Sequence, residues 1–234
     1  MFEKSHGIIV SCDVKSVDEL KNLVISTAGI DGIVGYKLGF MLGLRYGLPD
    51  IVSLVKDESD LPVIYDYQKA GTDIPEMADN FASIMKDVQV DSAIIFPQAG
   101  PATHEAFVNA LKKAGVIPMV GGEMTHPQYL EKDGGYIRND APEDIYKLAA
   151  SLGVEYFIVP GNKPDSVKKY AELLAEASPK FCMPGIGRQG GDIETAFNAC
   201  GEFDAYAIIG AAIYKSSDVK QAAKKFCETA LRFA

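Results

Sequence analysis

Charged residues gather in residues 66–73 (DYQKAGTD), where Asp66 and Asp73 flank the ammonium group of Lys69. A second ammonium group, Lys37, lies at the end of another apolar run. Burying such groups costs free energy unless opposite charges pair, so the alternating signs indicate an organised network. A preorganised ammonium group can stabilise negative charge that develops on a substrate. The alternative interpretation is a cluster of salt bridges on the surface.

A glycine-rich segment, residues 184–192 (PGIGRQGGD), provides a second candidate site. Glycines let backbone N–H groups approach an anion closely, and Arg188 can add a bidentate contact. Residues 208–214 (IIGAAIY) follow a later apolar run and strengthen this interpretation. We therefore predict a phosphate site, with residues 185–191 as its lid; a flexible surface turn is the alternative.

The other residue types capable of chemistry form no known catalytic pattern. The three histidines, His6, His104 and His126, lie far apart and lack the spacing of metal ligands, so no metal site is predicted. Ser-His-Asp, Walker A and early GxGxxG patterns are absent, which argues against hydrolase, NTPase and dinucleotide-binding functions. The four cysteines show no CxxC spacing and are interpreted as reduced thiols.

Composition narrows the class of partner. The chain has 234 residues, a net charge of −9 and a pI near 4.9, which makes a nucleic-acid partner unexpected. It contains no run of 18 apolar residues, so no membrane partner is predicted and a soluble, cytoplasmic protein is expected. A small anionic ligand remains compatible with the acidic composition, because backbone amides can bind phosphate.

Apolar runs alternate with amphipathic segments along the whole chain. The predicted strands are Gly7–Cys12, Gly32–Leu38, Leu61–Tyr67, Ser92–Phe96, Val116–Val120, Tyr156–Val159, Lys180–Met183 and Ala205–Ile209. The clearest predicted helices are Val17–Ala28, Pro75–Lys86, Thr103–Ala114, Pro142–Leu152, Asp165–Ala177 and Val219–Phe233. Ser16, Asp73 and Asp140 are predicted helix starts, and Gly115 and Gly153 are predicted helix ends.

Eight pairs, each of an apolar run and the segment that follows it, predict an α/β fold, with residues 1–234 forming a single (β/α)8 TIM barrel domain. A doubly wound open sheet is the alternative. A TIM barrel carries its active site at the C-terminal ends of its strands, where the charged segment, the glycine-rich segment and residues 123–127 (EMTHP) are all expected to lie. Residues 121–140 form the largest predicted loop, on a face of the barrel.

In their order along the chain, these motifs resemble those of the orotidine 5′-phosphate decarboxylase family, particularly its shorter archaeal type. The resemblance implies decarboxylation of orotidine 5′-phosphate (OMP) to uridine 5′-phosphate (UMP) in pyrimidine biosynthesis, without a cofactor, by a homodimer with shared active sites. The implied catalytic residues are Lys37, Asp66, Lys69 and Asp73. The implied substrate-binding residues are Asp13, Ile74, Thr125, Pro184, Gly187, Arg188, Gln189, Gly190, Gly210 and Ala211.

The resemblance also assigns roles to individual residues. Asp13 and Lys37 would bind the ribose, and Asp66 would lie beside the substrate carboxylate. Lys69 would stabilise and protonate the C6 carbanion, and Asp73 would reach into the neighbouring subunit's site. Thr125 would contact the pyrimidine, and Gln189 with the Gly210 backbone would hold the phosphate.

Three positions depart from the family pattern. The family's Asp-x-Lys-x-x-Asp spacing is Asp-x-x-Lys-x-x-x-Asp here, so either the strand end bulges or one role has moved. Ala211 stands where the family commonly has an arginine, and we hypothesise that Arg188 supplies that cation. Met77 replaces a threonine, which removes one hydrogen bond to the ribose.

Two other functions are compatible with these motifs. One is an Mg²⁺-dependent sister enzyme, either a keto-gulonate phosphate decarboxylase or a hexulose phosphate synthase, with Glu123 as a metal ligand. The other is a non-catalytic barrel that binds a phosphorylated metabolite. The glycine-rich segment and residues 124–127 (MTHP) favour the nucleotide decarboxylase.

Overall fold

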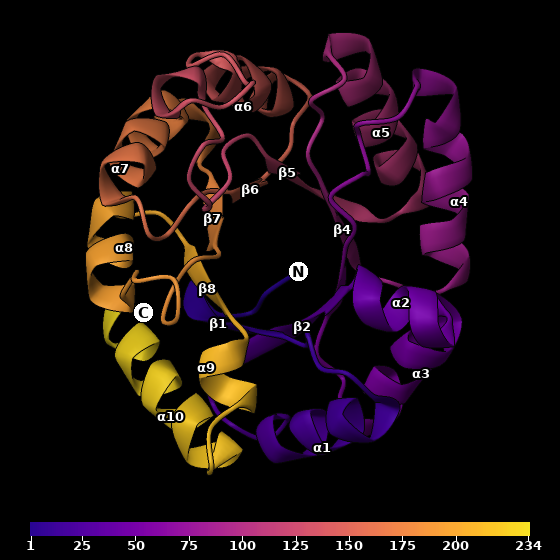
Figure 1. The fold of residues 1–234 in the computed structure, drawn as a ribbon, viewed down its shortest axis with the longest axis vertical. Helices are drawn as coiled ribbons and strands as arrows, with labels where there is room; N and C mark the ends of the chain where they lie inside the picture. The colour runs from indigo at the N-terminus through magenta and orange to yellow at the C-terminus, as the bar shows by residue number, and fades with distance from the viewer.

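The computed structural model describes residues 1–234 and contains a closed barrel of eight parallel strands, in the order β1 to β8, surrounded by helices (Figure 1). β1 pairs with both β2 and β8, which closes the sheet. The predicted (β/α)8 barrel is therefore confirmed, and the open doubly wound sheet is wrong. The strands are β1 (His6–Ser11), β2 (Ile33–Gly39), β3 (Val63–Asp66), β4 (Ser92–Ile95), β5 (Ile117–Gly121), β6 (Tyr156–Ile158), β7 (Lys180–Met183) and β8 (Ala205–Ile209).

Every predicted strand is present, with ends that shift by at most two residues. The predictions for β7 and β8 match the observed bounds. β3 differs most: it begins two residues later than predicted, at Val63, and ends one residue earlier, because Tyr67 leaves the strand for a turn in which its carbonyl accepts a hydrogen bond from the Ala70 N–H at 2.8 Å. This early exit from β3 determines which of the following side chains face the barrel.

Ten helices connect and cover the strands. They are α1 (Val17–Thr27), α2 (Phe40–Tyr46), α3 (Leu48–Glu58), α4 (Ala78–Asp87), α5 (Pro101–Ala114), α6 (Ala141–Ser151), α7 (Pro164–Leu173), α8 (Ile193–Cys200), α9 (Ala211–Tyr214) and α10 (Val219–Ala230). Short 3₁₀ turns are η1 (Pro75–Met77), η2 (Glu131–Asp133), η3 (Ala175–Ala177) and η4 (Leu231–Phe233).

Some predicted helix bounds need correction. The segments predicted as single helices at 75–86, 165–177 and 219–233 each combine an α-helix with a 3₁₀ turn, because the hydrogen bonding tightens at one end. Ser16 caps α1 as predicted, accepting a hydrogen bond from the Glu19 N–H. The helical segment after β3 begins at Pro75 as predicted, but Asp73 does not cap it: the Asp73 carboxylate instead accepts from the Ile74 N–H at 2.8 Å.

Two apolar layers stabilise the barrel. The larger lies between the strands and the surrounding helices, and the smaller fills the barrel interior. Along β3 the layers alternate: Val63 and Tyr65 belong to the outer layer, and Ile64 to the interior. Successive residues of a strand point to opposite faces, so this alternation follows from the pleat. Each fully buried aliphatic or aromatic side chain contributes about 1.5–3 kcal/mol to folding.

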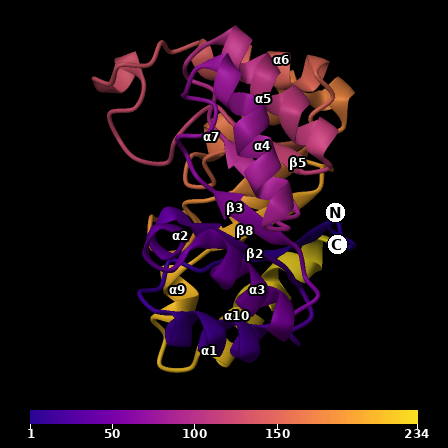
Figure 2. The same ribbon diagram turned by 90° about the vertical axis from the view of Figure 1, so that its right-hand side faces the viewer.

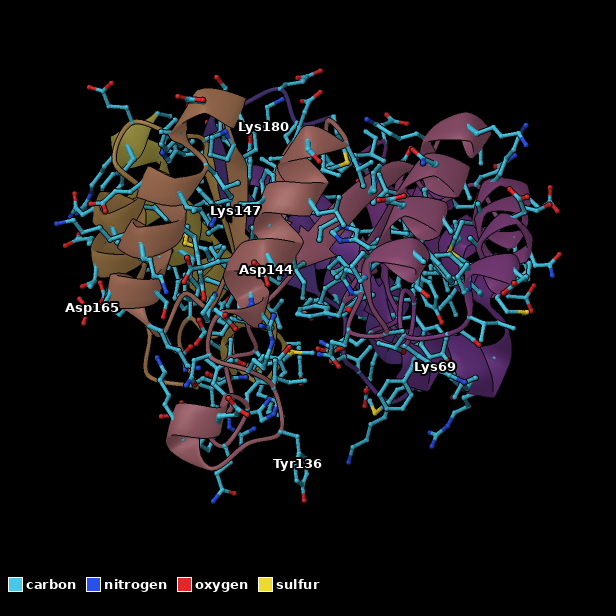
Figure 3. All side chains as sticks on the ribbon, turned by 90° about the horizontal axis from the view of Figure 1, so that it is seen from above. Lys69, Tyr136, Asp144, Lys147, Asp165 and Lys180 are labelled. Atoms are coloured by element: carbon cyan, nitrogen blue, oxygen red, sulfur yellow. The ribbon has the colours of Figure 1, made fainter.

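The two ends of the barrel differ. At the N-terminal end, the Phe2 ring packs on Tyr156 and Tyr206, with centroids 5.5 and 4.5 Å away, and covers the interior. Figure 3 shows Lys180, which begins β7, on the opposite side from Lys69 and Tyr136, which lie toward the C-terminal ends of the strands. The long connection between β5 and α6 projects beyond this end, as Figure 2 shows. No helix is long and apolar enough to cross a membrane.

Candidate active site

A charged array, in which Lys37 and Asp66 are largely buried and Asp13 is half exposed, lies at the C-terminal ends of β1, β2 and β3. The Lys37 ammonium lies 2.9 Å from Asp66 Oδ2 and 3.7 Å from Asp13 Oδ1. The Ser11 hydroxyl donates to Asp13 Oδ2 at 2.7 Å. The register creates this cluster, because Ser11 is paired with Lys37 and Gly39 with Asp66. A Cβ on Gly39 would lie 2.9 Å from Asp13 Oδ1, so a side chain at this position would displace the Asp13 carboxylate.

The electrostatics of the array favour a charged Lys37. Burial by itself would lower the pKa of Lys37, but the attraction of Asp66 and Asp13 outweighs burial and raises this pKa above its usual value. Lys37 is only 7% exposed, so its charge depends on these partners. The other Asp66 oxygen, Oδ1, is buried and has no hydrogen-bond partner. The array therefore presents a fixed cation together with one acceptor still open to a ligand.

These charges line a pocket of about 380 Å³ at the mouth of the barrel. Its lining residues are Ser11, Asp13, Lys37, Asp66, Gln68, Ile94, Phe96, Glu123, Met124, Thr125, Ile158, Pro184, Gly185, Ile186, Arg188, Gln189, Ile208, Gly210, Ala211, Ala212 and Tyr214. A larger cleft of about 740 Å³ lies outside the barrel, between α1, α2 and α10. We assign the site to the smaller pocket, because it contains the buried ion pair and the barrel's strand ends.

The glycine-rich segment forms the wall of the pocket after β7. Gly185, Gly187 and Gly190 all have positive φ angles, of 93°, 84° and 91°, which glycine adopts without strain. A Cβ on Gly185 would lie 2.9 Å from Asn162 Oδ1 and would crowd this wall. The segment closes on itself, because the Gly187 N–H donates to the Gly191 carbonyl at 2.8 Å. The glycines therefore shape a compact loop that carries Arg188.

Arg188 differs from the other cation of the pocket. Lys37 is paired with two carboxylates, whereas Arg188 takes part in none of the chain's ion pairs. Arg188 acts electrostatically on Tyr214, another lining residue: burial and then Asp13 raise the pKa of Tyr214, and Arg188 opposes them. The pocket thus has a compensated charged array at one wall and an uncompensated guanidinium at another.

The structure brings together nine of the fourteen predicted site residues around this pocket. They are Asp13, Lys37, Asp66, Thr125, Pro184, Arg188, Gln189, Gly210 and Ala211. The other five, Lys69, Asp73, Ile74, Gly187 and Gly190, do not line it.

Lys69 and Asp73 form their own pair at the rim, with 3.9 Å between Lys69 Nζ and Asp73 Oδ2. The Lys69 side chain is 62% exposed, because the turn after β3 directs it away from the pocket.

Glu123 belongs to a buried network beneath the loop after β5. It is 3% exposed, and its two carboxylate oxygens accept hydrogen bonds from Lys163 Nζ at 2.8 Å and the Tyr170 hydroxyl at 2.5 Å. Lys163 also donates to the Met124 carbonyl at 2.9 Å. This carboxylate holds the loop that carries Thr125, and its engagement argues against a role as metal ligand. No group of three or more His, Cys, Asp or Glu side chains is arranged to hold a metal ion.

Gln68 and Tyr214 line the pocket although neither was predicted as a site residue. The period-two pattern of β3, extended two residues beyond Asp66, is the sequence signal that could have identified Gln68. Tyr214 lies at the end of α9 and belongs to the 208–214 segment used to predict the phosphate site, but no sequence signal marked its own side chain as a site residue.

Comparisons with known proteins agree with the fold and identify a family. The family model described as "Orotidine 5'-phosphate decarboxylase / HUMPS family" matches residues 7–226. The orotidine 5′-phosphate decarboxylase of Methanococcus maripaludis is 31% identical over 219 residues, covering 94% of each chain. That of Pyrococcus furiosus is 31% identical over 221 residues, covering 94% of this chain and 96% of its own.

A crystal structure of the orotidine 5′-monophosphate decarboxylase of Methanocaldococcus jannaschii, complexed with the inhibitor BMP, has a TM-score of 0.83. It is 27% identical and covers 96% of this chain and 98% of its own. The orotidine 5′-phosphate decarboxylase of Pyrococcus horikoshii has a TM-score of 0.79 at 26% identity, covering 94% and 98%.

Proposed function

The chain belongs to the orotidine 5′-phosphate decarboxylase / HUMPS family, and we propose that it is a cofactor-independent carboxy-lyase that converts OMP to UMP and carbon dioxide. Curated relatives that carry this activity in their names match 94% of the chain. The main structural support for the proposal is the pocket, in which the Asp13–Lys37–Asp66 array forms one wall and the glycine-rich loop with Arg188 forms another. This arrangement suits a ligand with a reacting group at one end and a phosphate at the other.

The proposed reaction breaks the bond between C6 of the pyrimidine and its carboxylate. Carbon dioxide leaves, the electron pair stays on C6, and a lysine ammonium stabilises the carbanion and then donates a proton to it. Once this ammonium group is held inside the pocket, its charge stabilises the carbanion more than it stabilises the substrate. Asp66 would lie beside the substrate carboxylate, and Lys69 would supply the proton after turning inward from the rim.

Substrate binding would divide between the two walls. Asp13 and Lys37 would bind the ribose, and Thr125 the pyrimidine. The phosphate would bind against residues 184–190, with Gln189 and the Gly210 backbone as hydrogen-bond partners. Arg188 would provide the cation that Ala211 cannot. Phosphate binding to a glycine-rich loop after β7 matches the place where barrels commonly bind phosphate.

A homodimer with shared sites completes the proposal. Asp73 would enter the neighbouring subunit's pocket, and Ile74 would lie in the interface. Several large apolar side chains near this rim support such an interface, because they are unusually exposed: Ile74 is 59% exposed, Phe40 56% and Leu44 78%. Exposed apolar side chains that lie together commonly mark an interface.

The family description also includes the HUMPS enzymes, so an Mg²⁺-dependent sister function is the principal alternative. That function would use Glu123 as a metal ligand, and both carboxylate oxygens of Glu123 are instead engaged, by Lys163 and Tyr170. A barrel that binds a nucleotide without turnover is the other alternative. The names of the curated relatives favour the decarboxylase over both.

The direct test is a spectrophotometric assay with OMP, with and without EDTA. We expect wild-type protein to deplete OMP absorbance in EDTA, Lys69→Ala to lose this activity, and Lys225→Ala, on the exposed side of α10, to retain it. Absence of OMP turnover, or Mg²⁺-dependent turnover of a sugar phosphate alone, would contradict the proposal.

A further inference from the structure

The alternation of β3 continues beyond the end of the strand. Ile64 points into the barrel interior, Asp66 lines the pocket, and Gln68 lines the same pocket. Lys69 follows on the outside, in the ion pair with Asp73. The side chain that enters the pocket two residues after Asp66 is therefore a neutral amide, not an ammonium group.

Contacts on both sides of Gln68 hold this backbone in place. Ala70 is 3% exposed; its N–H donates to the Tyr67 carbonyl at 2.8 Å, and its carbonyl accepts from the Phe96 N–H at 3.0 Å. The Lys69 carbonyl accepts from both the N–H and the hydroxyl of Thr72. The position of Gln68 thus follows from an anchored turn that is tied to the neighbouring strand β4.

The wall of the pocket beside Gln68 already carries more negative than positive charge. Two carboxylates, Asp13 and Asp66, share the single ammonium of Lys37. A substrate carboxylate would add a third negative charge beside them, next to the unpartnered Oδ1 of Asp66. The Gln68 amide offers N–H donors without adding charge, and it is engaged in none of the chain's side-chain hydrogen bonds.

We infer that Gln68 donates a hydrogen bond to the carboxylate of the substrate and so distinguishes a 6-carboxylated pyrimidine nucleotide from the same nucleotide without that group. The inference rests on the proposed function and adds a specificity residue to it. Because the carboxylate still lies beside Gln68 while its bond to C6 breaks, the contact stabilises the bound substrate and the transition state alike, so Gln68 contributes to KM rather than to kcat.

The test compares OMP with UMP, which lacks the carboxylate. We expect Gln68→Ala to raise KM for OMP about tenfold, while kcat for OMP and Kd for UMP stay within about twofold. Gln68→Glu should raise KM for OMP about a hundredfold, because it places another carboxylate at this wall. Gln221→Ala, the same substitution on the exposed surface of α10, serves as the matched control.

Equal weakening of OMP and UMP binding, or an unchanged KM for OMP in Gln68→Ala, would overturn the inference. If the wild-type protein binds OMP without turning it over, the proposed function fails, but the inference is still tested by the two dissociation constants. The inference is supported if wild-type protein binds OMP more tightly than UMP and Gln68→Ala removes this difference. The inference is overturned if Gln68→Ala still binds OMP more tightly than UMP by the same factor. Because Gln68 is exposed at the rim, its variants are expected to melt at the wild-type temperature.

Discussion

Replacing Arg188 with alanine tests the proposed phosphate site most directly. Arg188 lines the pocket from the glycine-rich loop, and no carboxylate of the chain pairs with it. A guanidinium group can donate two parallel hydrogen bonds to a phosphate. We therefore expect Arg188→Ala to weaken the binding of OMP through its phosphate and leave the reacting wall of the pocket unchanged.

The expected magnitude follows from two charge-assisted hydrogen bonds. Arg188 is solvent-exposed, so the lower end of the usual range applies, about 1.5 kcal/mol for each bond. Loss of both costs about 3 kcal/mol, which corresponds to a decrease of roughly a hundredfold in kcat/KM, mostly through KM. Arg188→Lys keeps the charge but cannot donate two parallel hydrogen bonds, so kcat/KM for OMP should fall roughly tenfold.

The assay is steady-state decarboxylation of OMP, compared with that of orotidine, which has no phosphate. Arg188→Ala should lower kcat/KM for OMP and leave kcat/KM for orotidine unchanged. Arg232→Ala, which removes an exposed arginine paired with Glu194 at 3.3 Å, is the matched control. An unchanged KM for OMP, or an equal loss with orotidine, would refute the assignment of the phosphate to this loop.

Three further predictions concern stability and assembly. Glu123→Gln should lower the free energy of unfolding by about 2–4 kcal/mol in urea titrations, since it leaves Lys163 without its buried partner. Burial lowers the pKa of His104 to about 4, so the unfolded state binds its proton first, and stability should fall by up to about 3 kcal/mol as the pH drops from 6.5 to 4. His104→Phe should lose less stability over the same pH range, because it has no imidazole to protonate. An identical loss in wild-type and His104→Phe proteins would exclude His104 as the cause. If Asp73 acts in the partner's site, mixing and reassociating inactive Lys69→Ala and Asp73→Asn proteins should restore about one quarter of the activity, because half of the dimers are mixed and each has one intact site; no recovery would place both residues in one subunit's site.

Local periodicity predicted most of the fold. Strands of a parallel barrel are buried on both faces, so each appears as a short apolar run whatever its neighbours are. The eight runs, their order and six of the ten helices were therefore readable from the sequence, whereas α2, α3, α8 and α9 were not among the predicted helices. The glycine-rich segment was also predictable as a turn, since only glycine adopts the positive φ angles at 185, 187 and 190 without strain.

The predicted site was less complete, for a physical reason visible after β3. The residue types of the charged segment indicated a site, and Asp66 does line the pocket. Which of the next side chains enters depends on the turn held by Ala70 and Phe96, whose backbone groups are far apart in sequence. That contact keeps Gln68 at the pocket and Lys69 at the rim. The period-two spacing points to Gln68, but only the turn shows that the alternation continues past the end of β3.

The barrel, the glycine-rich loop and the presence of opposite charges at the strand ends could be predicted, because each depends on residue type and short-range pattern. The pairing of those charges depends instead on contacts between distant parts of the chain. Lys37 joins Asp66 across 29 positions of the chain, and Lys163 engages Glu123 across 40. Closing the barrel brings these groups within hydrogen-bond distance, and the resulting pairing leaves Arg188 as the one lysine or arginine lining the pocket that has no anionic partner.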